Sequence, residues 1–324
     1  MKTLLLTRSD IVSILTMEEA IDAVENAFKM KSAAESSVKA WLFYKEHGGD
    51  LACWSTYMRD IGASGMKAIG YNTNNPRRGL PTITAVIILH DPETSFPISI
   101  LDGTSLTAMR TGAAGAVAAK HLARKDSKVI GMIGAGVQAR TQLMGLNEIF
   151  EIEKVRVYDV SMDAGRKFSA EMEKLDLSVE VCTDAEAAVL GSDIVVTATP
   201  SREPIVMDGW VSPGLHINAM GADEPGKVEL DPLILTRAKI VVDDLEDTVR
   251  RGEINVAISK GIIKAEDIYA DLEEIVTGKR PGRESNREIT VFDGAGVAIE
   301  DVAVAWEAYK KAEKEGAGDY INLI

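Results

Sequence analysis

Residues that mark several large classes of protein are scarce in this chain. It has two cysteines, Cys53 and Cys182, and four histidines, none at the spacing of a metal-ligand set. So few cysteines exclude a disulfide framework and indicate a reducing compartment. We therefore expect no bound metal, and we assign the histidines no role.

Basic charge is also in short supply. Lysine and arginine number 36 against 50 aspartates and glutamates, a net charge of −14. Nucleic-acid binding needs a basic surface, so we expect no such partner, and the excess acid favours solubility. No stretch reaches the roughly 18 apolar residues of a membrane helix. The N-terminal apolar run stops at Arg8 and Asp10, shorter than a signal peptide. We expect a cytoplasmic protein without a membrane partner.

The chain is long enough for two domains, with 324 residues of which 46% are hydrophobic and 27% charged. From Lys128 onward, short apolar runs alternate with helical patterns, which predicts a doubly wound parallel sheet of the Rossmann type. The expected strands are residues 128–134, 154–160, 178–183, 193–200, 215–221, 239–245 and 288–294, with helices at 137–150 and 163–175 among them.

The N-terminal part has a different pattern. Near Thr16 a helix begins with apolar positions at Ala20, Ile21, Val24 and Phe28, and strand-like segments with turns follow. We predict a smaller α+β domain over residues 1–125. A last helix at about 297–315 is expected to return to it within residues 297–324, leaving the Rossmann-type domain at 126–296.

The most informative local motif is Gly134-Ala-Gly136-Val137-Gln-Ala139, which leaves an apolar strand and opens a helix. The first glycine permits a tight bend, the second lets the backbone approach a pyrophosphate, and a small third residue allows close packing. Asp159 ends the next strand, where a carboxylate accepts a hydrogen bond from a ribose hydroxyl and repels a 2′-phosphate. These residues predict NAD, in preference to NADP, as the cofactor.

Further strings in the chain resemble the ornithine cyclodeaminase/mu-crystallin family, which includes archaeal alanine dehydrogenases. They run in family order and include GMKAIGYNTNNP (65–76), RRGLPTITA (77–85), MRTGAAGAVAAKHLAR (109–124), IGAGVQARTQL (133–143), TATPSREPI (197–205), HINAMGADEPGKVELD (216–231), GEINVAISKG (252–261) and GRESNREITVFDGAGVAIEDVA (282–303). The sequences of these segments are most similar to the alanine dehydrogenase branch of the family. The resemblance implies a two-domain homodimer in which substrate and nicotinamide meet in the cleft between the domains. It makes residues 1–125, with 297–324, the domain for substrate binding and dimerisation, and residues 126–296 the NAD-binding domain.

The resemblance also implies roles for individual residues. Lys67 takes the place of the active-site lysine and Asp223 that of the catalytic acid/base, while Arg110 and Thr111 resemble a pair that contacts the cofactor phosphates. The remaining positions expected to bind the cofactor are Thr82, Gly134, Gly136, Val137, Gln138, Asp159, Thr199, Met220 and Lys227.

These residue types suit oxidation of an amino acid at its α-carbon. A hydride leaves for nicotinamide, the amine loses a proton, and water attacks the imine that results. A carboxylate such as Asp223 can relay those protons, and a lysine such as Lys67 can hold the substrate carboxylate and polarise the developing carbonyl. The protein would supply position and electrostatics, and the cofactor the redox chemistry.

One position departs from the family pattern. Where alanine dehydrogenases carry an arginine for the substrate carboxylate and cyclodeaminases a glutamate, this chain has Ala52, and Trp54-Ser55-Thr56 replaces Met-Pro-Ala. Losing a bidentate arginine costs about 1.5–3 kcal/mol of carboxylate binding unless another group replaces it. Lys39 is the best substitute and Arg59 another.

Four functions follow from these residues. The first is an NAD-dependent dehydrogenase for a small L-amino acid, with alanine and pyruvate as the nominal pair. The second is an ornithine cyclodeaminase, against which Ala52 counts, because nothing evident meets the distal amine. The third is a reductase of cyclic imine carboxylates, and the fourth is a cofactor-binding protein without activity, against which Lys67 and Asp223 argue.

Overall fold

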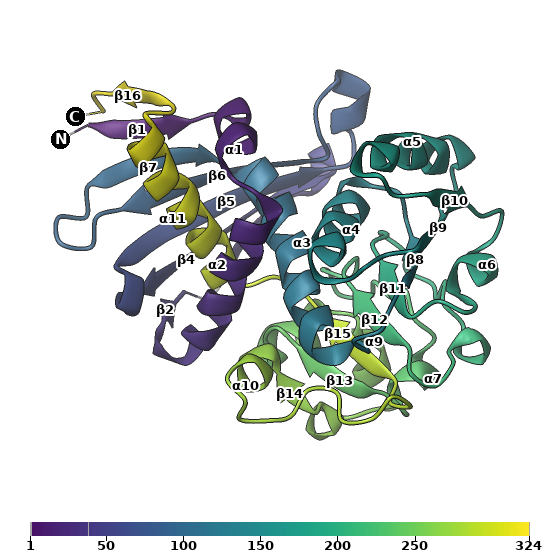
Figure 1. Cartoon of the computed structure of the whole chain (residues 1–324). Helices are drawn as coiled ribbons and strands as arrows, with labels where there is room; N and C mark the ends of the chain where they lie inside the picture. Colours follow the sequence, from purple (N-terminus) through teal and green to yellow (C-terminus); the bar gives the residue numbers. More distant parts are fainter. Residues whose placement is uncertain (1, 38, 324) are drawn as a thin grey trace. The chain divides into compact units, whose positions relative to one another are not determined.

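The computed structural model describes residues 2–37 and 39–323, which form two compact units (Figure 1). Unit 1 comprises residues 1–110 and 297–324, and unit 2 comprises residues 111–296. The boundary expected at 125/126 and the division observed between Arg110 and Thr111 both fall near helix α3 (Gly103–Leu122), which continues through the division. No helix within the described ranges is long and apolar enough to cross a membrane.

Unit 1 is built on a mixed sheet of eight strands with helices on one face. The strand order is β16-β1-β7-β6-β5-β4-β2, with β3 also paired to β4. The strands are β1 (Thr3–Leu6), β2 (Glu35–Ser36), β3 (Ala40–Tyr44), β4 (Gly49–Met58), β5 (Ala63–Asn72), β6 (Ile83–His90), β7 (Pro97–Asp102) and β16 (Asp319–Ile321). The helices are α1 (Arg8–Ile14), α2 (Met17–Lys29) and α11 (Ala298–Glu315).

The helix expected near Thr16 is α2. Thr16 caps it and Glu19 completes a capping box, so two exposed backbone N–H groups are satisfied at its start. Its apolar stripe, which includes Ala20, Val24 and Phe28, is buried. Helix α11, expected at 297–315, packs on α2 and on β4, β5 and β6. It therefore brings the end of the chain onto the sheet of unit 1.

Unit 2 is the parallel sheet predicted from the apolar runs. Its order is β10-β9-β8-β11-β12-β15-β13-β14, with every neighbouring pair parallel. The strands are β8 (Val129–Ile133), β9 (Lys154–Tyr158), β10 (Val179–Val181), β11 (Ile194–Thr197), β12 (His216–Ala219), β13 (Lys239–Val242), β14 (Ala270–Asp271) and β15 (Thr290–Asp293). The helices are α4 (Val137–Ile149), α5 (Met162–Met172), α6 (Ala185–Val189), α7 (Pro232–Leu235), α8 (Leu245–Arg251), α9 (Ile254–Ser259) and α10 (Leu272–Val276).

The strand order of unit 2 reverses beside β8. From β8 the chain runs outward through β9 to β10, then returns to β11 on the other side of β8. Parallel strands must be joined by crossovers, and α4 and α6 serve in two of them. A crevice at the carboxyl ends of the strands beside such a reversal is the usual ligand site of this fold. The predicted Rossmann class is therefore confirmed.

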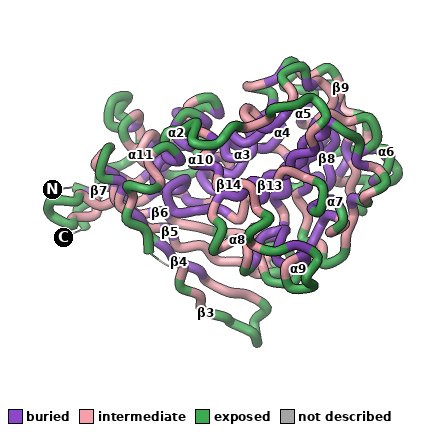
Figure 2. Tube along the Cα trace, turned by 90° about the horizontal axis from the view of Figure 1, so that it is seen from below, coloured by how far each residue is buried: buried purple, intermediate pink, exposed green. Residues whose placement is uncertain are grey.

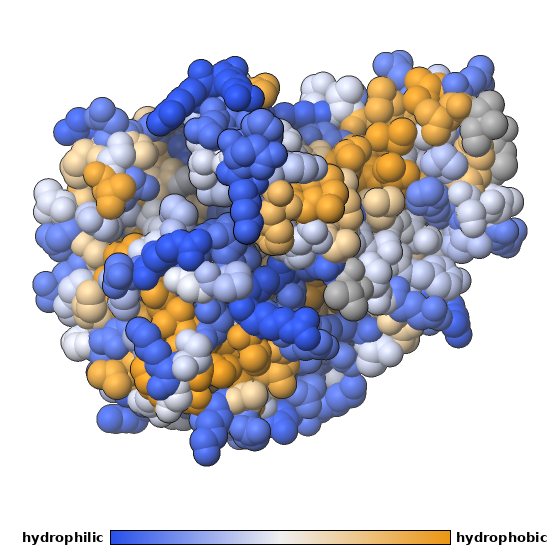
Figure 3. Space-filling model, turned by 180° about the vertical axis from the view of Figure 1, so that it is seen from behind, coloured by the Kyte–Doolittle hydropathy of each residue, from blue (hydrophilic) through white to orange (hydrophobic). Residues whose placement is uncertain are grey.

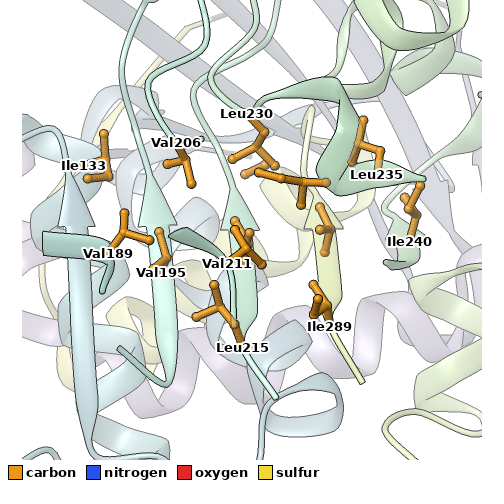
Figure 4. Close-up of a cluster of buried hydrophobic side chains, with 14 of the residues drawn as sticks. Ile133, Val189, Val195, Val206, Val211, Leu215, Leu230, Leu235, Ile240 and Ile289 are labelled. Carbon is orange, nitrogen blue, oxygen red and sulfur yellow. The ribbon is translucent and has the colours of Figure 1, made fainter. Parts of the chain in front are cut away.

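Apolar packing fixes the sheet of unit 2. A cluster of buried side chains includes Ile133 on β8, Val195 on β11 and Ile240 on β13, together with Val189 from α6 (Figure 4). Strands that are buried on both faces need continuous apolar runs, which is why the sequence showed no alternation there. By contrast, β3 of unit 1 is largely exposed (Figure 2).

Candidate active site

Lys67 is the most unusual side chain of unit 1, because it is a lysine that is only 1% exposed. It lies on β5, on the face that also buries Ala63 and Gly65. Its Nζ donates to Asp301 Oδ1 at 2.5 Å and to Thr107 Oγ1 at 3.2 Å. The same nitrogen lies 4.6 Å from the ring centroid of Trp54, the residue that pairs with Lys67 across β4 and β5.

Two consecutive acids of α11 meet Arg110 of α3. Arg110 Nη1 donates to Glu300 Oε2 at 2.7 Å, and its Nε donates to Asp301 Oδ1 at 3.0 Å. Trp54 Nε1 donates to the second oxygen of Asp301, also at 3.0 Å. Asp301 therefore binds Lys67, Arg110 and Trp54 at once. We call Lys67, Arg110, Glu300 and Asp301 the charged cluster of unit 1.

Burial sets the protonation of this cluster. It lowers the pKa of Lys67 from 10.5 to about 7, since Asp301 offsets only part of the burial and Arg110 adds repulsion. Burial acts to raise the pKa of Asp301, but the ammonium and the guanidinium outweigh it, so that pKa is lowered. Burial raises the pKa of Glu300 despite Arg110. Lys67 can therefore gain and lose a proton near neutral pH.

The residues around the family's specificity position are apolar. Ala52 is fully buried and pairs with Trp41 on β3 and Ile69 on β5, next to Trp54 and Ala298. Lys39, the expected substitute for arginine, places its Nζ 4.7 Å from the ring centroid of Trp54. The other expected substitute, Arg59, forms an exposed ion pair with Glu35.

In unit 2 the glycine motif forms the expected turn between β8 and α4. Gly134 has φ of +101°, and a Cβ there would lie 2.7 Å from the carbonyl oxygen of Ala198, so only glycine fits. A Cβ on Gly136, the N-cap of α4, would meet nothing within 4 Å. Ala139 is fully buried, as close packing of helix and strand requires. The turn leaves open space in front of the helix N-terminus.

Asp159 lies beside this turn, at the end of β9. Its Oδ2 accepts from the backbone N–H of Ala135 at 2.9 Å and its Oδ1 from that of Ser161 at 2.8 Å. The two bonds fix the carboxylate next to the glycine turn. The exposed Val137 begins α4, and Gln138 contacts Thr141 within the same helix.

The carboxyl ends of β11 and β12 carry the other predicted residues of unit 2. Thr199 contacts the glycine turn, since its Cγ2 would lie 3.0 Å from a Cβ on Gly134. Thr199 donates from its N–H and its hydroxyl to Glu229 Oε1, each at 2.7 Å. Met220 is buried just after β12. The turn, Thr199 and Met220 therefore gather at one edge of the sheet.

Asp223 and Lys227 form an ion pair beyond β12. The distance from Lys227 Nζ to Asp223 Oδ1 is 2.6 Å, and Glu224 lies 3.5 Å from the same nitrogen. The side chain of Asp223 is 56% exposed and that of Lys227 only 8%. Asp223 is thus a carboxylate that solvent and small molecules can reach, held in place by a buried ammonium.

Two predicted cofactor residues have backbone roles here. The carbonyl of Thr111 accepts from Gln142 Nε2 at 2.6 Å, and the carbonyl of Thr82 accepts from the N–H of Asn72 at 2.9 Å. No role was predicted for Asp301, Glu300 or Glu229, although all three lie in segments that resemble the family. The sequence feature that could have indicated Glu300 and Asp301 is a pair of acids within an otherwise apolar helical segment, AIEDVAVAW.

The chain belongs to the ornithine cyclodeaminase/mu-crystallin family, whose model matches residues 1–316. It is 46% identical over 324 residues to the alanine dehydrogenase of Archaeoglobus fulgidus, covering 100% of this chain and 99% of that protein.

Two solved structures are also similar. One is an archaeal alanine dehydrogenase dimer with bound NAD, with a TM-score of 0.96 and 46% identity, covering 100% of both chains. The other is the Δ1-pyrroline-2-carboxylate reductase of Thermococcus litoralis with NADH and L-proline, with a TM-score of 0.96 and 41% identity, covering 98% of this chain and 100% of that one. The family expected from the sequence motifs is confirmed.

Proposed function

We propose that this protein is an NAD-dependent oxidoreductase that interconverts a small L-amino acid, nominally alanine, with its 2-oxo acid and ammonia. The buried Lys67 carries the proposal, because its pKa of about 7 suits proton transfer at the pH of a cell. Lys67 is 1% exposed, and Asp301, Thr107 and the ring of Trp54 hold its ammonium group in place.

Three features of unit 2 support NAD as the cofactor. The glycine turn leaves open space at the N-terminus of α4, whose N-cap residue provides no side-chain hydrogen bond. Helix N-termini of this kind bind phosphate through free N–H groups and the helix dipole. Asp159 supplies a fixed carboxylate for ribose hydroxyls and repels a 2′-phosphate. NAD, when bound, accepts or returns the hydride.

The chain's own groups handle the protons and the substrate. The protonated Lys67 binds the carboxylate or the oxygen of the substrate electrostatically, and its near-neutral pKa lets it exchange a proton there. Asp223 takes a proton from the amine or from the water that attacks the imine. In the forward direction the amino acid loses a hydride and a proton, water adds to the imine, and ammonia leaves.

A reductase of cyclic imine carboxylates is the second candidate. Ala52, Trp41, Trp54 and Ile69 form an apolar surround that suits a ring better than an amine. The same residues disfavour ornithine, since the described side chains packed around Ala52 in this cluster are apolar and two ammonium groups lie beside Trp54. The similar reductase with bound L-proline adds support.

We also propose that the protein is a homodimer through the uncovered face of the unit 1 sheet. Side chains such as Met66, Ile88 and Ile100 alternate with buried ones and are only partly covered. Seen from the side away from α2 and α11, apolar side chains gather over this sheet (Figure 3). An apolar patch on a sheet face is typical of a protein interface.

The mass in solution tests this proposal. Light scattering should give twice the chain mass of 34.9 kDa. Ile88→Glu should halve it, and the exposed Val12→Glu should leave it unchanged.

The experiment that tests the activity is NADH oxidation by the purified protein. Pyruvate with ammonium tests the dehydrogenase, cyclic imine carboxylates without ammonium test the reductase, and ornithine with catalytic NAD tests release of ammonia. Lys67→Met should lower turnover by roughly 10²–10⁴-fold while NADH binding remains. Turnover that survives in Lys67→Met would contradict the assignment. NADH binding without turnover of any substrate would leave a cofactor-binding protein.

A further inference from the structure

The ring of Trp54 contacts two lysines. On β4 it pairs with Lys67 of β5, and on its other side Lys39 directly precedes β3, whose first residue pairs with Cys53. The two Nζ atoms lie 4.7 Å and 4.6 Å from the centroid of its ring. An ammonium group within about 6 Å of an indole face is attracted by the ring quadrupole. One aromatic side chain therefore contacts both ammonium groups, while Arg110 lies on the far side of the shared Asp301 carboxylate from the indole N–H.

The ring itself is fixed. Trp54 is 7% exposed, and its Nε1 donates to Asp301 Oδ2 at 3.0 Å. Asp301 binds Lys67 through its other oxygen. The same carboxylate thus anchors the indole and one of the two ammonium groups. Rotation of the ring would break the Asp301 bond, so the ring cannot turn freely away from the lysines.

The small residue at position 52 matches the large one at position 54. Ala52 is fully buried against Trp54, Trp41 and Ala298. Residues two apart on a strand point to the same face, so a long side chain at 52 would compete with the indole. An arginine there would also add a third positive charge beside Lys39 and Lys67. Ala52 and Trp54 therefore replace, as a matched small and large pair, the arginine and methionine that the family resemblance leads us to expect at these positions.

The upper limit on the distance between the two ammonium groups is compatible with a small substrate. The two ammonium nitrogens are at most 9.3 Å apart, since they lie 4.7 Å and 4.6 Å from one centroid. A carboxylate and the adjacent carbonyl or imine group span about 3–4 Å. Two charge-assisted hydrogen bonds of about 2.8 Å each bring the total to about 9 Å. A 2-oxo or imino carboxylate is therefore long enough to contact both lysines at any separation up to this limit.

We propose that Trp54 is a positioning residue that determines specificity: its ring holds Lys39 and Lys67 as a pair of cations for the substrate carboxylate and its neighbouring carbonyl or imine group, in place of the arginine absent at position 52. This inference rests on the proposed function. It predicts acceptance of 2-oxo or imino monocarboxylates and rejection of substrates with a cationic side chain, which the two ammonium groups repel.

The test compares Trp54→Met, Trp54→Phe and the double variant Ala52→Arg/Trp54→Met. Trp306→Met is the matched control, because it removes a half-buried tryptophan of unit 1 that contacts Tyr309. The probe is oxamate, a carboxylate beside an amide carbonyl that cannot be reduced, titrated calorimetrically with and without NADH. We expect Trp54→Met to weaken oxamate binding and to raise the substrate KM about tenfold, with kcat much less affected. The oxamate affinity of Trp54→Phe should lie between those of the wild type and Trp54→Met. The double variant Ala52→Arg/Trp54→Met should recover oxamate binding.

A pH profile separates positioning from mere stability. The ring favours the charged form of Lys67, which also faces Asp301, Glu300, Arg110 and Lys39. The limb of kcat/KM that reports loss of the Lys67 proton should therefore move to lower pH in Trp54→Met and stay in place in Trp306→Met. A folded Trp54→Met with unchanged oxamate affinity and pH limb would overturn the inference. Weaker oxamate binding in Trp54→Met, with no turnover even by the wild type, would instead overturn the proposed function alone.

Discussion

The two units of this protein bury charge in opposite ways. In unit 1, Lys67 and Arg110 lie against Glu300 and Asp301, so the charged cluster is balanced by opposite signs. In unit 2, Glu229, Glu253 and Asp293 are also fully buried, but among the described residues none of the three has a cation within ion-pair distance. We call these three the carboxyl cluster of unit 2.

The carboxyl cluster is held by neutral donors. Glu229 accepts from Thr197 and Thr199 and from the N–H of Gly221, and Glu253 accepts from the N–H groups of Glu229 and Leu230. Burial raises the pKa of Glu253 well above its usual range, with Glu229 adding repulsion, and it raises the pKa of Asp293 to about 7. In unit 2, burial therefore raises the pKa values of the acids, whereas in unit 1 cations lie against them. The proton exchange that we propose for Lys67 takes place in the cluster with ion pairs, whereas the carboxyl cluster accepts hydrogen bonds from backbone N–H groups and threonine hydroxyls.

Removing the shared acid of unit 1 should have the largest effect. Asp301→Asn leaves Lys67 and Arg110 buried without their common carboxylate, and loss of one partner of a buried pair costs about 3–5 kcal/mol. Turnover at neutral pH should also fall, because Lys67 loses the charge that favours its protonated form. Denaturant unfolding measures the first effect and NADH oxidation the second.

Glu307→Gln is the control for that prediction. Glu307 pairs with Lys310 on the exposed part of α11, where such pairs contribute about 0–1 kcal/mol. If Asp301→Asn is no less stable than Glu307→Gln, the cluster does not depend on opposite charges and the comparison between the units fails.

The pH dependence of stability should separate the two clusters. The pKa of Asp293 is raised from 3.8 to about 7, so the folded state keeps a proton that the unfolded chain loses, and this contribution to stability falls as pH rises from about 4 to 7. The pKa of Lys67 is lowered from 10.5 to about 7, so its contribution rises with pH from about 7 to 10.5. Each contribution is on the order of a few kcal/mol.

Two variants test whether each pH range of changing stability comes from the residue named for it. Asp293→Asn should flatten the stability curve between about pH 4 and 7, and Lys67→Met should flatten it above pH 7. Unfolding free energies measured by denaturant titration across these pH values give the slopes. Equal slopes in wild type and variant would show that the group in question is not shifted by folding.

Much of unit 2 follows from local sequence. Buried parallel strands need unbroken apolar runs, so KVIGMIG and DIVVTATP identified β8 and β11 closely. The glycine turn also has a local cause, because Gly134 must adopt positive φ and Gly136 must leave space. The division of the chain did not follow, since α3 continues through it as one alanine-rich helix without a break.

The site of unit 1 depends on contacts that are distant in sequence. Asp301 reaches Lys67 across 234 residues, and no local pattern pairs them. Trp54 faces Lys67 only because the turn between β4 and β5 sets the register, and a slip of one residue would send Trp54 to the other face. The family resemblance predicted that Lys67 and Arg110 belong to the site. That the acids and the tryptophan lie around them could be seen only in the folded structure.

The smallest effect expected is that of Glu229→Gln, which tests whether the carboxyl cluster holds the cofactor side of unit 2. The amide nitrogen would face two of the donors that now meet a carboxylate, which costs about 1–3 kcal/mol and should loosen Thr199 and Gly221. Since Thr199 contacts the glycine turn, we expect the Kd for NADH, measured by fluorescence titration, to rise about tenfold while oxamate still binds the NADH-saturated enzyme. Glu186→Gln on the exposed side of α6 is the control and should leave NADH binding unchanged. Unaltered NADH affinity in a stable Glu229→Gln would mean that the cluster supports the fold of unit 2 without positioning the residues beside the glycine turn.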